Sequence, residues 1–169
     1  MAGDTSTSWL NGDEMAAWRS LVTLVQRAFP EIERDLRLND GLQPAQYQIF
    51  VVLSEAPGRR LRLTDLACAA DISPSRLTHR LRTLVDRGEV EIHPDPGDKR
   101  AKLAELTKKG QRRLEAAAPG HAATVRRVIF DHLTDQQSRA IAEALAPVID
   151  SLCAHPEYLN PQDTVSEPT

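Results

Sequence analysis

The stretch from Leu63 to Thr107 restricts the fold of this chain more than any other part of its sequence. It begins with a helix of about two turns, which we expect Thr64 to cap, followed by a tight turn at residues 71–73. Pro74 suits the first position of a second helix, whose apolar face carries Leu77, Leu81 and Leu84. Two short helices joined by so tight a turn are typical of a helix-turn-helix.

Two short strands are predicted directly after the second helix. Residues 90–93 alternate apolar and polar side chains, as a half-buried strand does, and residues 101–106 supply a returning strand. The sequence DPGD at 95–98 between them is a strong turn signal, and residues 60–63 suit a short edge strand. This order predicts a mainly α chain with a small β-wing, a winged helix-turn-helix. The second helix of such a module enters the major groove of DNA.

The distribution of charge supports a nucleic-acid partner, although the whole chain has a net charge of −3. Residues 59–113 contain 14 Lys and Arg against 8 Asp and Glu, a balance of +6. The rest of the chain contains 7 basic and 16 acidic residues, a balance of −9. A basic segment framed by acidic ones would turn its basic face towards phosphate.

Long amphipathic segments flank the predicted module. The first carries an unbroken heptad stripe of apolar residues, Met15, Trp18, Val22, Val25, Phe29, Ile32 and Leu36. One small domain cannot bury a stripe of about six helical turns, so we expect part of it to face a second copy of the chain. Two further helices follow the wing, starting after Thr107 and Thr134. Prolines inside the three flanking helices are expected to bend or interrupt them, namely Pro30, Pro119 and Pro147.

These segments predict a chain of four parts. Residues 1–10 form a flexible N-terminus, and residues 42–107 form the winged helix-turn-helix DNA-binding domain. The segments 11–41 and 108–153 form a helical dimerisation region, and residues 154–169 form a disordered tail rich in proline.

The sequence resembles the MarR family of bacterial transcription regulators over roughly residues 9–153. The most specific part of the resemblance is DPGDKR at 95–100, followed by Leu106-Thr107-x-x-Gly110. ISPSRLTHRL at 72–81 resembles the recognition helix of the family, with His79 where arginine is commoner. The resemblance implies a homodimer with interlocked first and last helices. It also implies a repressor released by small phenolic or other aromatic ligands, or by thiol oxidation.

The predicted DNA-binding residues lie on the second helix and at the wing. Short polar side chains there suit base edges, and cationic side chains suit guanine or phosphate. For Arg76 and Arg80, contacts with guanine and with phosphate both remain open. Arg82 suits a phosphate or a partner within the chain. Ser73 suits helix capping. At the wing, the resemblance implies that Asp98 orients Arg100. The full set is Ser73, Ser75, Arg76, Thr78, His79, Arg80, Arg82, Asp98, Lys99 and Arg100.

The sequence argues against enzyme activity, because it lacks a nucleophile-elbow serine motif, a phosphate-binding glycine loop and a zinc-protease motif. His121 and His132 are not at metal-ligand spacing, so we expect neither a metal site nor a cofactor. Without an apolar run of about 18 residues, we expect a cytoplasmic protein with no membrane contact.

The partners predicted from sequence are double-stranded DNA, a second copy of the chain and a small aromatic effector. The effector would lie between the dimerisation helices and the winged domain, near Trp18 and Tyr47. The alternative for these two residues is that they belong to the hydrophobic core. Two alternatives remain open at this point. Cys68 or Cys153 would sense oxidants if activated, although inert thiols fit their surroundings better. In the second alternative, the winged helix-turn-helix docks a protein partner, and DNA binding has been lost.

Overall fold

The computed structural model describes residues 9–154, apart from the side chains of Lys99, Cys153 and Ala154. Most of the predicted flexible N-terminus and of the predicted disordered tail therefore lies outside the described residues. The helices are α1 Gly12–Asp40, α2 Pro44–Glu55, α3 Leu63–Ala69, α4 Pro74–Asp86, α5 Lys108–Val128 and α6 Asp135–Ala154. The strands are β1 Arg60–Arg62, β2 Val90–Asp95 and β3 Asp98–Leu106, and two short 3-10 turns span Pro57–Arg59 and Phe130–His132.

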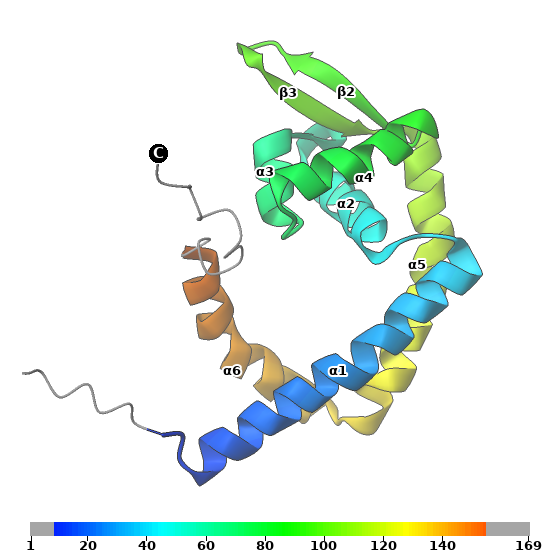
Figure 1. Ribbon diagram of the computed structural model, residues 1–169. Coiled ribbons are helices and arrows are strands. Elements are labelled where there is room, and N and C mark those ends of the chain that lie inside the picture. The colour runs from blue at the N-terminus through cyan, green and yellow to red at the C-terminus, as the bar shows by residue number, and fades with distance from the viewer. Residues whose placement is uncertain (1–8, 155–169) are drawn as a thin grey trace, which may run out of the picture.

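The predicted fold class is confirmed: helices form most of the described chain, beside a single small β-wing (Figure 1). The three strands are antiparallel in the order β1-β3-β2, so the expected edge strand at residues 60–63 is present as β1. Val90 pairs with Leu106 at the root of the wing, and Asp95 pairs with Asp98 at its tip. Side chains alternate between the two faces of this sheet.

A single core lies under the inner face of the wing, between α2, α3, α4 and the start of α5. Apolar side chains at helical spacing on α4 and at alternating positions of the strands point into it. Its largest members are Leu42, Ile49, Phe50, Leu53, Leu66, Leu77, Leu84 and Val90, all nearly inaccessible to solvent. This core holds α4 against the wing and thereby fixes the position of both elements.

The start of α4 agrees with the sequence and the start of α3 does not. Ser73 caps α4 by accepting a hydrogen bond from the Arg76 N–H at 3.4 Å. Helix α3 begins at Leu63 with Arg62 as its N-cap residue, and Thr64 Oγ1 donates to the neighbouring Asp65 carboxylate instead. The prediction that Thr64 caps α3 is wrong, because β1 runs directly into the helix and leaves no capping position at residue 64.

None of the three prolines interrupts its helix within the described residues, and the expected bends stay a prediction. Pro30, Pro119 and Pro147 lie inside α1, α5 and α6, which continue through them. Pro30 and Gln26, whose carbonyl loses its N–H partner, are both exposed, so water can bind that carbonyl. An exposed helix face therefore tolerates the proline.

The start of α5 is fixed to the turn that follows α4. Thr107 Oγ1 accepts from the Gly110 N–H at 3.1 Å and lies within hydrogen-bond distance of the Gly88 and Glu89 carbonyls. The Lys109 ammonium donates to the Arg87 carbonyl at 2.6 Å. These bonds join the base of the wing, the end of α4 and the long helix α5.

The α1 and α5 helices lie side by side, whereas α6 turns away from them and runs back towards the side on which the winged domain lies (Figure 1). The described side chains of α6 are exposed except for Ser138 and Leu145, which are half-buried. On α1, Trp18, Val25 and Phe29 of the heptad stripe are 57%, 54% and 49% exposed, whereas Leu36 is buried. Within residues 9–154, no helix combines the length and the apolar character that crossing a membrane requires.

Candidate DNA interface

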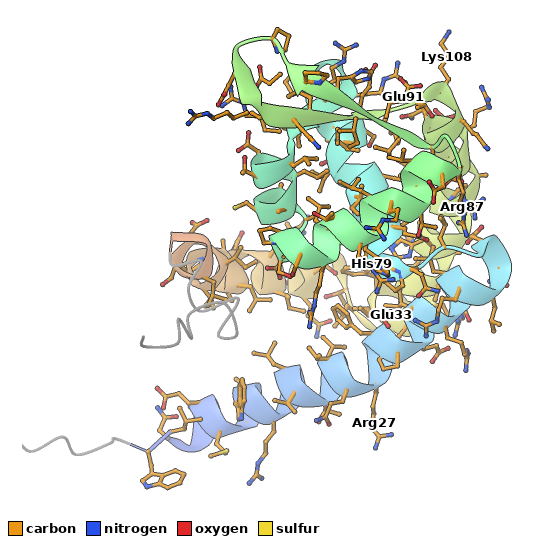
Figure 2. All side chains as sticks on the ribbon, turned by 45° about the horizontal axis from the view of Figure 1, so that its top comes forward. Arg27, Glu33, His79, Arg87, Glu91 and Lys108 are labelled. Carbon is orange, nitrogen blue, oxygen red and sulfur yellow. The ribbon has the colours of Figure 1, made fainter. Side chains whose placement is uncertain are left out.

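Helix α4 presents the predicted recognition residues on the side opposite its buried leucines. Ser75, Arg76, Thr78, His79 and Arg82 are exposed, while Ser73 and Arg80 are half-buried. Figure 2 shows His79 on the outer side of α4, with Arg87 just beyond the end of the helix. The turn before α4 is tight because Asp71 adopts a left-handed conformation with φ of 52°, which a short polar side chain tolerates.

Three of the predicted hydroxyl groups, those of Ser73, Ser75 and Thr78, are engaged within the helix start. Thr78 Oγ1 donates to the Pro74 carbonyl at 2.9 Å, and the hydroxyl oxygens of Ser73 and Ser75 lie 3.2 Å apart. The Ser73 hydroxyl also serves as the helix cap, as described above. A base contact by Thr78 or Ser73 would therefore compete with a bond inside the protein.

The predicted residues of α4 separate into two groups. Ser75, Arg76, His79 and Arg80 line one open hollow of about 510 Å³ beside the turn. Thr78 and Arg82 line a second hollow of about 230 Å³, between α4 and the wing. Lys102 of β3, which was not among the residues predicted from the sequence, also lines the second hollow. Lys102 is exposed, so it extends the cationic surface from α4 to the wing.

At the wing tip, Asp98 contacts the main chain of Arg100. Its carboxylate accepts a hydrogen bond from the Arg100 N–H at 2.9 Å, which fixes the start of β3. The Arg100 side chain is exposed, and the side chain of Lys99 lies outside the described residues. Asp98 thus positions Arg100 by binding the backbone N–H of Arg100.

Asp95 and Arg62 anchor the wing to the domain, a pair that sequence reasoning missed. The Arg62 Nε donates to the Asp95 carboxylate at 2.6 Å, and the Gly97 N–H donates to its other oxygen at 2.8 Å. The Gly97 N–H, and after it Arg62, hold the pKa of the Asp95 carboxyl below its usual value, despite the opposing effect of burial. The stabilisation by this carboxylate is therefore present at neutral pH and is lost as the pH falls through the lowered pKa.

Trp18 and Tyr47, the predicted effector contacts, lie in different surroundings. Tyr47 is half-buried against the core, with its ring 4.5 Å from that of His121. Burial lowers the pKa of His121 and raises that of Tyr47. Trp18 lies on the exposed half of α1.

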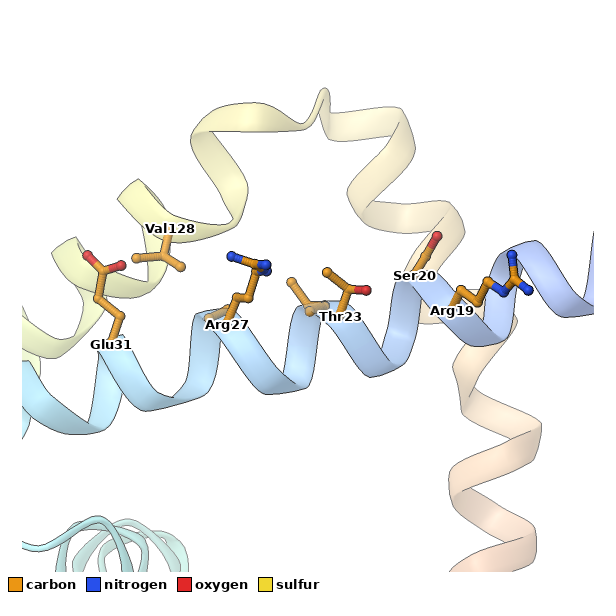
Figure 3. A pocket seen from close by; sticks show the side chains of 8 residues that line it. Arg19, Ser20, Thr23, Arg27, Glu31 and Val128 are labelled. Carbon is orange, nitrogen blue, oxygen red and sulfur yellow. The ribbon is translucent and has the colours of Figure 1, made fainter.

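A hollow of about 540 Å³ between α1 and α5 is a second candidate ligand site, apart from the surroundings of Tyr47. Arg27 of α1 and Val128 of α5 point into it, and Arg19, Ser20 and Thr23 extend it along α1 (Figure 3). Its lining combines the guanidinium groups of Arg19 and Arg27, the apolar side chains of Leu24 and Val128, and the Glu31 carboxylate, which pairs with Arg127 at 2.6 Å.

Comparisons with known proteins agree with this geometry. A family model described as MarR family matches residues 40–101. The chain is 36% identical to Sco3205, a MarR family transcriptional regulator from Streptomyces coelicolor solved in complex with DNA, with a TM-score of 0.81 over 88% of this chain and 93% of that one. It is 34% identical to AbsC, a MarR family transcriptional regulator from the same organism, with a TM-score of 0.81 over 88% of this chain and 100% of that one.

A curated relative extends the comparison to another bacterium. The HTH-type transcriptional repressor YetL of Bacillus subtilis (strain 168) is 29% identical over 112 residues, which cover 66% of each chain. Members of this family are transcriptional regulators, in agreement with the prediction that the chain is not an enzyme. From the winged fold, the cationic recognition helix and the identity to these regulators, it follows that this protein is a MarR family transcriptional regulator.

Proposed function

We propose that this regulator is a homodimeric repressor that binds a pseudo-palindromic operator and is released by a small effector. The observation that carries the proposal is the exposed row of Arg76, His79 and Arg82 on a helix whose other face is locked in the core. A helix held this way presents its polar side to the major groove. The wing then reaches the flanking minor groove, where Arg100 meets a narrow, negatively charged surface.

The dimer is supported by the apolar surface that one chain leaves uncovered. Ile141, Val148, Ile149 and Leu152 of α6 are each between 41% and 55% exposed, in addition to the exposed part of the heptad stripe on α1. Contiguous apolar surface of this kind marks an association site. We therefore assign residues 11–41 and 108–153 to dimerisation and residues 42–107 to DNA binding. Two-fold symmetry would place the recognition helices about one DNA turn, ~34 Å, apart.

A gel-shift titration tests the proposal. The full chain is mixed with DNA from its own promoter region and with random duplex, at several salt concentrations. Operator binding should be at least about 10³-fold tighter than binding to random DNA at the same salt, and both should weaken as salt rises. Equal affinity for the two duplexes would contradict sequence-specific regulation and favour the alternative in which the winged domain docks a protein.

The roles of the wing and of the recognition helix can be separated with two variants. Arg100→Ala should weaken binding to operator and random DNA together, and should flatten the salt dependence by about one unit per subunit, because it removes a phosphate contact. His79→Ala should cost about 1–3 kcal/mol per half-site on the operator and much less on random DNA, because the major groove distinguishes all four base pairs. Gel shifts with half-site variants measure both effects. If Arg100→Ala changes base preference while His79→Ala weakens all duplexes equally, these roles are reversed.

Effector release is supported by the hollow between α1 and α5. A guanidinium group beside apolar side chains suits a small aromatic acid. Its carboxylate would meet Arg19 or Arg27, since Arg127 already pairs with the Glu31 carboxylate in this hollow. Binding that changes the packing of α1 against α5 would shift the spacing of the recognition helices. The gel shift repeated with benzoates, phenols and oxidants tests this step. A response to oxidants that Cys68→Ser abolishes would instead assign release to the exposed Cys68 thiol.

A further inference from the structure

Three metal-ligating side chains meet on the outer face of the wing, away from the DNA-binding residues. Glu91 and His93 are two positions apart on β2, so their side chains share one face. Glu105 of β3 is the direct cross-strand partner of Glu91. Figure 2 shows Glu91 at the root of the wing near Lys108, far from His79 on α4.

The distances between the ligand atoms suit a small divalent cation. His93 Nε2 lies 3.4 Å from Glu91 Oε2 and 3.1 Å from Glu105 Oε2. The three donor atoms all lie within 4.8 Å of one another. Bonds of about 2.0–2.1 Å in a tetrahedral site place neighbouring ligand atoms about 3.3 Å apart. The two carboxylate ligand atoms lie within 4.8 Å of each other, so small side-chain rotations bring them to this spacing.

Two carboxylates face each other across the paired strands at this position. Like charges directly opposite each other on paired strands destabilise a sheet, and Glu91 faces Glu105 in this way. Arg60 of β1 lies 2.9 Å from Glu105 Oε2 and offsets part of this repulsion. The His93 Nε2 atom is buried by its neighbours and has no hydrogen bond of acceptable geometry within the described residues. No hydrogen bond within the described residues therefore uses this nitrogen, which is the ligand atom that a metal ion would take.

The site is open to solvent on one side. The Glu91, His93 and Glu105 side chains are 61%, 42% and 25% exposed, so rotation of these side chains, without opening of the fold, admits an ion to His93 Nε2. A hollow of about 280 Å³ beside the two carboxylates, which Arg59 and Lys108 also line, has room for a coordinating water. One imidazole and two carboxylates neutralise a divalent ion, and the imidazole favours zinc over magnesium or calcium.

We propose that Glu91, His93 and Glu105 form a Zn²⁺ site that ties β2 to β3 at the root of the wing. Each residue supplies one ligand atom, and water fills the fourth position. Arg60 competes with the ion for Glu105, so binding of zinc releases this guanidinium. The site involves none of the proposed DNA contacts, so its test is independent of operator binding.

Zinc titration of the full chain by calorimetry, with a chelator as competitor, tests the proposal. The wild-type chain should bind one Zn²⁺ per subunit, and thermal unfolding should shift to higher temperature as zinc is added. His93→Ala should weaken this binding at least about tenfold, since loss even of an outer-shell partner costs that much. Arg60→Gln should tighten it, because the competing cation is gone.

A matched control excludes binding elsewhere. His132 is also exposed, and His132→Ala should leave the stoichiometry and affinity unchanged. Substitution of Co²⁺ gives a second readout, since its visible absorption should appear with the wild-type chain and disappear with His93→Ala. Equal zinc binding by the wild type and His93→Ala, with circular dichroism showing both folded, would overturn the proposal. So would failure of the wild-type chain to bind zinc.

Discussion

Replacement of Gly110 by alanine should lower the free energy of unfolding by about 3 kcal/mol, the upper end of what overpacking usually costs. A Cβ at this position would lie 2.6 Å from Leu106 Cδ1 and still closer to the Glu89 carbonyl oxygen. That oxygen also accepts from the Thr107 N–H at 3.2 Å, so it cannot move without loss of the junction between α5 and the wing. Urea denaturation at fixed protein concentration measures the change.

Gly120→Ala supplies the matched control in the same helix. Among the described residues, nothing beyond the neighbouring backbone of α5 lies within 4 Å of a Cβ built at Gly120. Alanine there should raise the free energy of unfolding by about 0.5–1 kcal/mol, because glycine in a helix interior costs conformational entropy. Equal effects of the two substitutions would show that the close approach at Gly110 is not what requires glycine there.

The paired substitution Val25→Asp and Phe29→Asp should abolish the dimer. Both side chains are about half exposed in one chain and belong to the heptad stripe on α1, so we expect the partner to bury them. Carboxylates buried without a partner cost several kcal/mol each, and both subunits carry them. Operator affinity should then fall by about 10³-fold or more, towards that for random DNA, because a single half-site remains.

Light scattering after size-exclusion chromatography measures the mass, and a gel shift measures the affinity. Leu38→Asp is the control, because Leu38 is 75% exposed on the same helix but lies outside the heptad stripe. It should leave both the mass and the affinity unchanged. A folded dimer with normal operator affinity after the double substitution would contradict the proposed interface.

The elements that sequence reasoning located best are those whose signals are local. Ser73, Pro74 and the leucines of α4 act within one or two helical turns, and the structure places the helix where they predict. The capping pair Thr134 and Gln137 is likewise present, with the Gln137 N–H donating to Thr134 Oγ1 at 3.2 Å. Thr64 does not cap α3, although threonine is a suitable cap residue. Strand β1 runs directly into the helix, so Arg62 takes the N-cap position.

The missed contacts join residues far apart along the chain. Arg62 and Asp95 are 33 positions apart, and their ion pair exists only because β1 and β2 flank the same central strand. Arg113 of α5 lies 3.4 Å from the buried Glu89 carboxylate and also donates to the Asp40 carbonyl at 3.0 Å. Residue spacing predicts neither pair.

The sequence by itself determined the order of the helices and strands, the family and the set of exposed polar residues on α4. The order of the elements and the exposed face of α4 depend on periodicity, capping and turn residues, which act over a few positions. The family instead rests on the resemblance of the wing and α4 motifs to known regulators. Only the tertiary structure decided that Arg62 anchors the wing, that Lys102 shares a hollow with Arg82, and that Glu91, His93 and Glu105 meet. Strand register and helix packing set such contacts, because they bring side chains together that no local pattern relates.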